Sequence, residues 1–185
     1  MTRRPYSVFA TVLTLTLIID QITKAAIRAW MGPVGTSIAL AGSWLRLTYV
    51  RNPGAAFGML PEHRGVFIVV SFLVILGIGL YVFKMRPTRS LVVVALGLVC
   101  GGAVGNLIDR LLFGMVTDFI EVRHVPVFNA ADSAISVGVT LLVLWLLFSP
   151  SDGGEHADAT TPDHGVPIDP VPSETGAGQD VRDEA

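Results

Sequence analysis

The chain has 185 residues, of which 51% are hydrophobic and only 15% are charged, and its formal net charge is −2. A soluble domain usually carries about 25% charged residues, so this balance indicates a membrane protein. The basic residues form no stripe interleaved with aromatic residues, so the sequence gives no sign of nucleic-acid binding. The single cysteine, Cys100, excludes an intramolecular disulfide and a cysteine-rich metal site, and the histidines form no HExxH zinc motif.

The first apolar segment, at about 7–28, follows Arg3 and Arg4. A secretory signal peptide begins in the same way, but this run continues through polar residues without a small-x-small cleavage site. We therefore interpret it as a first membrane span with a polar far end. Asp20 and Lys24 are four residues apart and share a helix face. We expect them to form an ion pair that holds the helix end, with direct chemistry as the alternative.

The segment at about 29–65 differs in character and is predicted to lie outside the membrane. Residues 38–51 contain β-branched and aromatic residues in partial alternation, which predicts short strands interrupted at Gly42. The sequence NPGAAFG at 52–58 then favours a turn whose glycines allow close approach to a ligand. A plain loop explains the same motif, so the residues alone leave the role of Asn52 and Gly54 open.

Three more apolar segments, at about 66–84, 91–113 and 129–148, are predicted to span the membrane. The result is an all-α polytopic membrane protein with four transmembrane helices, in one domain at 1–149, and a small extracytoplasmic β-structure at about 29–65 and 114–128. Basic residues cluster tightly at the N-terminus and between the second and third spans. We therefore place both termini in the cytoplasm, although more basic residues are dispersed on the opposite side. Residues 150–185 are predicted to form a disordered, acidic cytoplasmic tail.

The third span carries two stripes with a spacing of four residues. Glycines recur from Gly97 to Gly105, a pattern that lets another helix approach closely. The second stripe contains Asn106 and Arg110, which could line a groove and bind a peptide backbone or could clamp a neighbouring helix. Asp109 falls on the glycine stripe, so we expect it to form a structural ion pair.

Two aspartates near the third and fourth spans could form an acid/base pair. If 116–122 is extended, Asp118 lies on its apolar face, where lost hydration raises the pKa of a carboxyl. Asn129 is the predicted N-cap of the fourth helix, and Asp132 then takes the third helical position, where the dipole favours its charged form. Carboxyls of different acidity that share a water can hydrolyse an amide. Alternatively, Asp132 is a cap and Asp118 a turn residue, and the pair requires the extended segment to fold back onto the helix start.

Five short blocks, taken together and in this order, resemble the lipoprotein signal peptidase (signal peptidase II) family. The blocks are DQITK at 20–24, NPGAAFG at 52–58, GGAVGNLIDR at 101–110, VTDFI at 116–120 and FNAADS at 128–133. The resemblance implies a four-helix bundle with a β-cradle. It also implies an aspartyl endopeptidase of the bacterial inner membrane, which cuts prolipoproteins just before a diacylglyceryl-modified cysteine.

The resemblance also implies roles for individual residues. Asp118 and Asp132 match the family's catalytic pair, and Asn106 and Arg110 match positions that contact the peptide backbone. The remaining motif positions, expected to bind substrate or to support the site, are Asp20, Lys24, Asn52, Gly54, Asp109, Asn129 and Ala131. The loop around 55–65 is expected to close over the site.

The expected partners follow from the same family. They are diacylglyceryl-modified prolipoproteins, membrane lipids and globomycin-type inhibitors, which fill the cleft. We expect a monomer that uses no cofactor, no metal and no nucleic acid.

Two functions of other classes stay open from the residue pattern. A small proton-coupled carrier would use the carboxylates as a relay and predicts polar residues near the middle of the spans. The polar residues here gather at one side instead. A non-catalytic membrane assembly subunit would use the glycine stripe, and it predicts that both aspartates tolerate asparagine.

Overall fold

The computed structural model describes residues 4–54 and 64–149. These residues contain four helices long and apolar enough to cross a membrane: α1 (Arg4–Trp30), α2 (Arg64–Met85), α3 (Ser90–Phe113) and α4 (Ala130–Phe148). The predicted spans agree with these helices to within a few residues, so the fold class is confirmed. The predictions for the loop around 55–65, except its last two residues, and for the tail at 150–185 lie outside the described residues.

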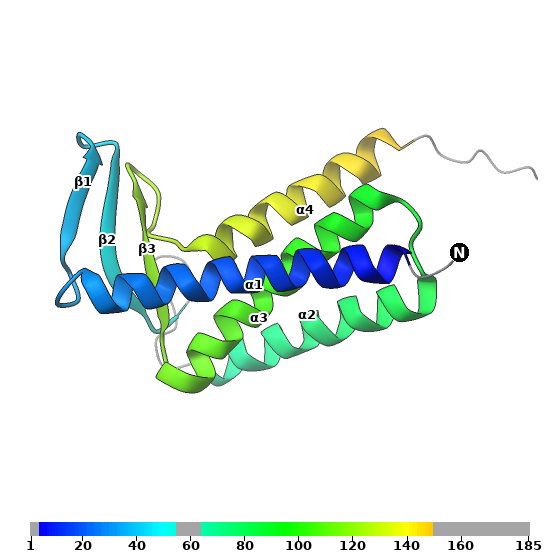
Figure 1. The fold of residues 1–185 in the computed structure, drawn as a ribbon, viewed down its shortest axis with the longest axis horizontal. Helices are drawn as coiled ribbons and strands as arrows, with labels where there is room; N and C mark the ends of the chain where they lie inside the picture. Colours follow the sequence, from blue (N-terminus) through cyan, green and yellow to red (C-terminus); the bar gives the residue numbers. More distant parts are fainter. Residues whose placement is uncertain (1–3, 55–63, 150–185) are drawn as a thin grey trace, which may run out of the picture. The chain divides into compact units, whose positions relative to one another are not determined.

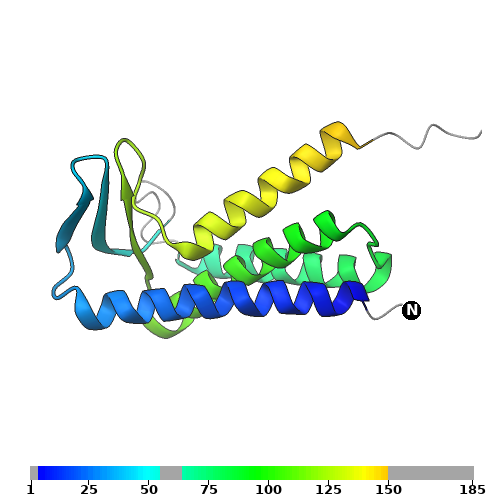
Figure 2. The same ribbon diagram turned by 45° about the horizontal axis from the view of Figure 1, so that its top comes forward.

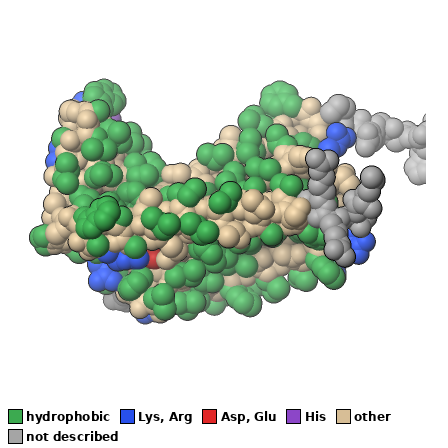
Figure 3. Space-filling model, viewed as in Figure 1, with side chains coloured by type: hydrophobic (Ala, Val, Ile, Leu, Met, Phe, Trp, Pro, Cys, Tyr) green, Lys and Arg blue, Asp and Glu red, His purple; other side chains and the backbone are tan. Residues whose placement is uncertain are grey.

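Helix α3 lies at the centre of the bundle and packs against α1, α2 and α4 (Figures 1 and 2). Most of α3 is buried, whereas the other helices turn large apolar side chains outward, such as Phe72 and Leu146. Figure 3 shows hydrophobic side chains along the length of the helices and basic side chains mainly near their two ends. Lipid tails can cover such an apolar surface, because the helices satisfy their own backbone hydrogen bonds.

Glycines let α3 approach α1 and α4 closely. A Cβ atom added at Gly101 would lie 2.8 Å from the carbonyl oxygen of Leu13 in α1. A Cβ atom added at Gly102 would lie 2.8 Å from Cγ1 of Ile135 in α4. The prediction that the glycine stripe allows close packing is confirmed, because Gly101 lies against α1. Gly102, on the neighbouring face of α3, lies against α4 instead.

We expect Gly101→Ala to lower the free energy of unfolding by about 1–3 kcal/mol, because the added methyl group overpacks the α1–α3 contact. Gly79→Ala is the matched control, because a Cβ atom there meets nothing within 4 Å. In that exposed helical position alanine is favoured by up to about 1 kcal/mol. Unfolding of both variants in detergent micelles measures the difference, and equal stability would contradict the close contact.

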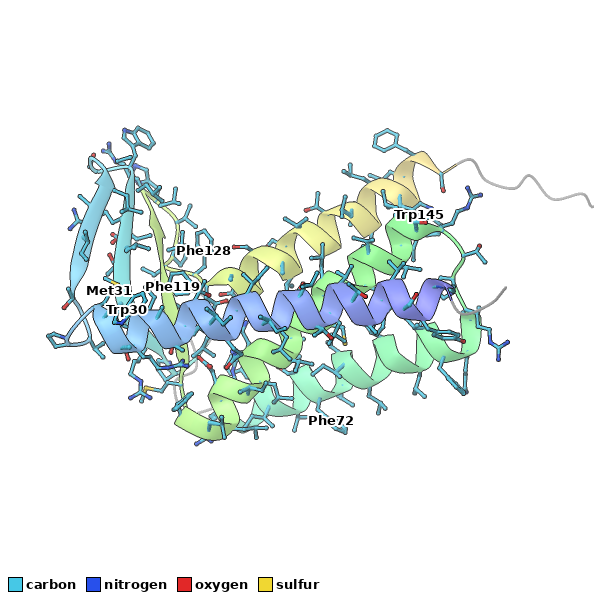
Figure 4. All side chains as sticks on the ribbon, viewed as in Figure 1. Trp30, Met31, Phe72, Phe119, Phe128 and Trp145 are labelled. Carbon is cyan, nitrogen blue, oxygen red and sulfur yellow. The ribbon has the colours of Figure 1, made fainter. Side chains whose placement is uncertain are left out.

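Three strands form an antiparallel sheet beyond the bundle end that lies away from the N-terminus (Figure 1): β1 (Ser37–Ala41), β2 (Leu45–Asn52) and β3 (Val116–Val122), in that order. The strands predicted within 38–51 and at 116–122 are therefore confirmed. An apolar cluster joins the sheet to the end of α1, and Figure 4 labels two of its members. The cluster consists of Ile27, Met31, Tyr49 and Phe119.

The chain doubles back after β3 and enters α4. The reversal includes His124 in the left-handed region, with φ 67°. Phe128 then pairs with β3, because its N–H donates to the Ile120 carbonyl at 3.0 Å and its carbonyl accepts from the Ile120 N–H at 2.8 Å. The next residue, Asn129, caps α4. This reversal confirms the fold-back that the aspartate pair requires.

Candidate active site

The first turn of α4 fixes Asp132. Asn129 has an extended backbone, and its Oδ1 accepts a hydrogen bond from the Asp132 N–H at 2.9 Å. In return, the backbone N–H of Asn129 donates to Asp132 Oδ2 at 3.2 Å. This reciprocal capping box satisfies free N–H groups of the helix start. The predicted N-cap and the predicted helical position of Asp132 are both confirmed.

The sheet register fixes Asp118. Asp118 pairs with Val50, and Asn52 pairs with Val116, so Asn52 and Asp118 are diagonal neighbours on adjacent strands. Asn52 Nδ2 donates to Asp118 Oδ2 at 2.9 Å, and Asn129 Nδ2 donates to Asp118 Oδ1 at 2.7 Å. The Asp118 side chain is only 2% exposed. Asn129 therefore donates to both carboxylates, to Asp118 through its side chain and to Asp132 through its backbone N–H.

Burial raises the pKa of Asp118 from its ordinary value of 3.8 to about 6. Lost hydration is the largest cause, and the negative charge of Asp132 adds to it. The hydrogen bonds from Asn52 and Asn129, and the positive charge of Lys24, act in the opposite direction. The rise in pKa expected for this carboxyl is confirmed.

The raised pKa makes the free energy of unfolding depend on pH. Between pH 3.8 and about 6 the folded protein keeps a proton on Asp118 that the unfolded chain releases. The stabilisation that comes from this proton is therefore fully present below this window. It is lost as pH rises through the window, which lowers the free energy of unfolding by roughly 3 kcal/mol. Thermal unfolding in detergent from pH 4 to pH 8 measures this loss, which Asp118→Asn should remove. The same pH dependence in both proteins would contradict the assignment.

Asp132 is held from the bundle side by Asn106. The Asn106 Nδ2 donates to Asp132 Oδ1 at 2.8 Å. Each oxygen of Asp118 and Asp132 thus accepts a hydrogen bond from a described residue. A carboxylate oxygen has two lone pairs, so each oxygen keeps capacity for a water molecule or a substrate.

Both carboxyl groups line one cavity of about 600 Å³. Four of the other predicted site residues line it as well: Asn52, Gly54, Asn106 and Arg110. The rest of the wall is mainly apolar and comes from Val116, from 125–128 after β3 and from Ile135 and Val137 in α4. The cavity therefore combines a polar end, where proton transfer is possible, with an apolar wall.

The guanidinium of Arg110 connects three elements at the cavity. Its Nη1 donates to the Asn106 carbonyl at 3.3 Å, and its Nη2 donates to the Gly54 carbonyl at 3.5 Å. The group also lies 5.3 Å from the ring centroid of Phe67 in α2. The Gly54 N–H donates to Asn52 Oδ1 at 3.0 Å, which turns the Asn52 amide nitrogen toward Asp118.

The remaining predicted residues lie behind the cavity wall and do not line it. Asp20, Lys24 and Asp109 are fully buried, and Lys24 Nζ lies 2.9 Å from Asp20 Oδ2 and 3.8 Å from Asp109 Oδ2. The Ala131 N–H donates to Asp20 Oδ1 at 3.0 Å. The predicted Asp20–Lys24 ion pair and the ionic contacts of Asp109 are confirmed.

Sequence reasoning missed Arg28 and Gln21. Arg28 Nη1 donates to Thr117 Oγ1 at 3.0 Å and lies 3.6 Å from Asp109 Oδ1. Gln21 Nε2 donates to the Gly105 carbonyl at 3.1 Å, which ties α1 to α3. Arg28 could have been found, because it continues the four-residue spacing from Asp20 and Lys24. Residues 125–128, which form part of the apolar cavity wall, show no spacing or motif from which this role could have been predicted.

A family model described as "Signal peptidase (SPase) II" matches residues 12–148. This chain belongs to the signal peptidase II family. A lipoprotein signal peptidase from Pelotomaculum thermopropionicum is 45% identical over 141 residues, covering 76% of this chain and 91% of the relative. Another from Moorella thermoacetica is 45% identical over 146 residues, covering 79% of this chain and 97% of the relative.

Solved structures show the same architecture. One, described as a bacterial membrane enzyme, superposes with a TM-score of 0.73 at 32% sequence identity, and the match covers 82% of this chain and 94% of that structure. Signal peptidase II enzymes are aspartic peptidases of bacterial membranes, so the prediction of a multi-pass membrane protease is confirmed. The family match gives no support to a proton-coupled carrier or a non-catalytic assembly subunit.

Proposed function

We propose that this chain removes signal peptides from prolipoproteins by cutting on the amino side of a diacylglyceryl-modified cysteine, with Asp118 and Asp132 as the catalytic pair. The observation that carries the proposal is that two carboxyls, from a strand and from a helix start, line one cavity and both bond to Asn129. Their different surroundings support different roles in proton transfer.

The proposed reaction needs one proton on the pair at the start. The raised pKa of Asp118 favours that residue as its holder. A water between the carboxyls attacks the scissile carbonyl carbon and passes its proton to Asp132, while Asp118 gives its proton to the carbonyl oxygen. The resulting diol then returns a proton to Asp118, Asp132 protonates the leaving nitrogen, and the C–N bond breaks. Both carboxyls end as they began, and one water is consumed.

The cavity wall suggests how the substrate lies. Arg110, held between Asn106 and Gly54, can donate hydrogen bonds to a peptide backbone that crosses the polar end. The apolar wall formed by 125–128 and by α4 can take the apolar side chains of a signal peptide. In this arrangement the acyl chains stay in the bilayer and the signal helix lies among the spans. Closure of the loop around 55–65 remains part of the proposal.

The proposed orientation places the sheet and the cavity on the extracytoplasmic side and both termini in the cytoplasm. It is supported by the basic residues between α2 and α3, which lie at the bundle end away from the sheet (Figure 1). We place the peptidase domain at 1–149, with 150–185 as an acidic tail beyond the residues that the family model matches. In this proposal the protein acts as a monomer and is surrounded by membrane lipids.

The test uses purified full-length protein in detergent with a synthetic precursor whose cysteine carries the diacylglyceryl group. The matched control is the same peptide without the lipid. We expect a gel shift, and mass spectrometry should place the cut just before the modified cysteine, in the lipidated precursor only. Globomycin should block the cut. Equal cleavage of both peptides, or cleavage elsewhere, would overturn the proposed specificity.

A further inference from the structure

A buried ionic cluster lies directly behind the proposed catalytic pair. Lys24 from α1 contacts Asp20 from the same helix and Asp109 from α3, and all three side chains are 0% exposed. Removing charges from water costs several kcal/mol per ion. Apolar residues of similar size in the same place often make a fold at least as stable as a buried ion pair does. Stability alone is therefore a weak reason for this cluster, and its contacts suggest a more specific task.

Each carboxylate of the cluster holds the backbone one residue before a site aspartate. Asp20 Oδ1 accepts from the N–H of Ala131, which precedes Asp132. Asp109 Oδ2 accepts from the N–H of Thr117 at 2.9 Å, and Thr117 precedes Asp118. The two buried carboxylates therefore anchor the two chain segments from which the catalytic pair projects.

The ammonium of Lys24 also sets the orientation of Asn106. Lys24 Nζ donates to Asn106 Oδ1 at 2.9 Å, and an ammonium group can only donate. The amide oxygen must therefore face Lys24, which turns Nδ2 of Asn106 toward Asp132 Oδ1 at 2.8 Å. A flipped amide would point its own N–H groups at the ammonium and leave Asp132 without this donor.

From these contacts we infer that Lys24 is a positioning residue for the peptidase reaction: it orients the Asn106 amide toward Asp132 and anchors the two carboxylates that hold the backbone before Asp132 and Asp118. This inference rests on the proposed function. Lys24 does not line the cavity, so its loss should act on the pair rather than on the bound peptide. The expected signature is a lower kcat with little change in KM.

The test must separate positioning from simple charge balance. Lys24→Met leaves Asp20 and Asp109 buried without their ammonium partner, and this variant should lose stability. Lys24→Met combined with Asp20→Asn removes one of those charges and keeps the side-chain oxygen that accepts from Ala131. The double variant should regain most of the lost stability. Lys84→Met is the control, because Lys84 is exposed in the last turn of α2.

Steady-state cleavage of the lipidated precursor is measured with thermal unfolding for all variants. We expect kcat of the double variant to stay at least about tenfold below wild type, with KM within about threefold, because a small displacement of reacting groups is costly. Lys84→Met should match wild type. The inference would be overturned if the double variant recovered kcat together with stability, or if its change were confined to KM. It would also be overturned if both Lys24 variants failed to fold. Failure of the proposed function is distinguishable, because wild type would then cleave nothing.

Discussion

Asp118→Asn and Asp132→Asn are each expected to lower kcat for a lipidated precursor by at least about a thousandfold, because an amide neither takes nor gives the proton that the reaction needs. The loss should appear in kcat and kcat/KM alike, since neither substitution removes a wall of the cavity. Each variant is purified in detergent and assayed by gel shift, with its unfolding temperature measured in parallel.

Glu121→Gln provides the matched control for these two substitutions. Glu121 lies on β3, three residues after Asp118, but it is partly exposed, contacts Arg46 and Thr48 and does not line the cavity. The turnover of Glu121→Gln should stay within about threefold of wild type. The only ion pair that it removes among the described residues, with Arg46, is partly exposed, and such pairs contribute little energy. Near-normal turnover by either aspartate variant with an intact fold would end the proposal of a catalytic pair.

Asn129→Ser should lower kcat by about a hundredfold, because serine keeps the helix cap but lacks the amide that donates to Asp118 Oδ1. The same amide also donates to Asn106 Oδ1 at 3.2 Å, so one substitution loosens both sides of the pair. The loss of stability should be about 1–3 kcal/mol, because buried acceptors lose a donor even though serine keeps the cap. Gel-shift kinetics and thermal unfolding measure the two effects.

Asn129→Ala is the informative comparison for the serine variant. Alanine removes the cap as well as the amide, so it should cost about 1 kcal/mol more stability than serine while reducing turnover to a similar degree. If Asn129→Ser kept normal turnover and only alanine reduced it, Asn129 would act as a helix cap alone.

The elements of this fold could be predicted from local sequence signals. Long apolar runs located the four helices, and the spacing from Asn129 to Asp132 predicted a capped helix start that the structure confirms. The extended conformation expected for 116–122, after Gly114, is also found, and Gly114 ends α3 in the left-handed region with φ 78°. These signals act within one helical turn or one strand, which is why short windows of sequence reveal them.

The contacts that assemble the site depend on distant parts of the chain. Asn52 reaches Asp118 only because β2 pairs with β3 in a register that shifts between Leu47 and Val50. Asp20 bonds to the backbone of Ala131 across 111 residues of sequence. No local pattern in the sequence predicts either the register shift or this long-range contact. Resemblance to a known family therefore identified these residues, whereas their geometry required the structure.

The assembly of the pair has a consequence for how the enzyme is made. Asp118 precedes the last helix, and Asp132 lies in its first turn, on the two arms of the reversal that Ile120 and Phe128 close. A growing chain that ends after β3 has only one of the two carboxyls and no Asn129 to join them. With the proposed pair as the catalytic groups, peptidase activity requires that α4 has been made and has packed against the rest of the chain.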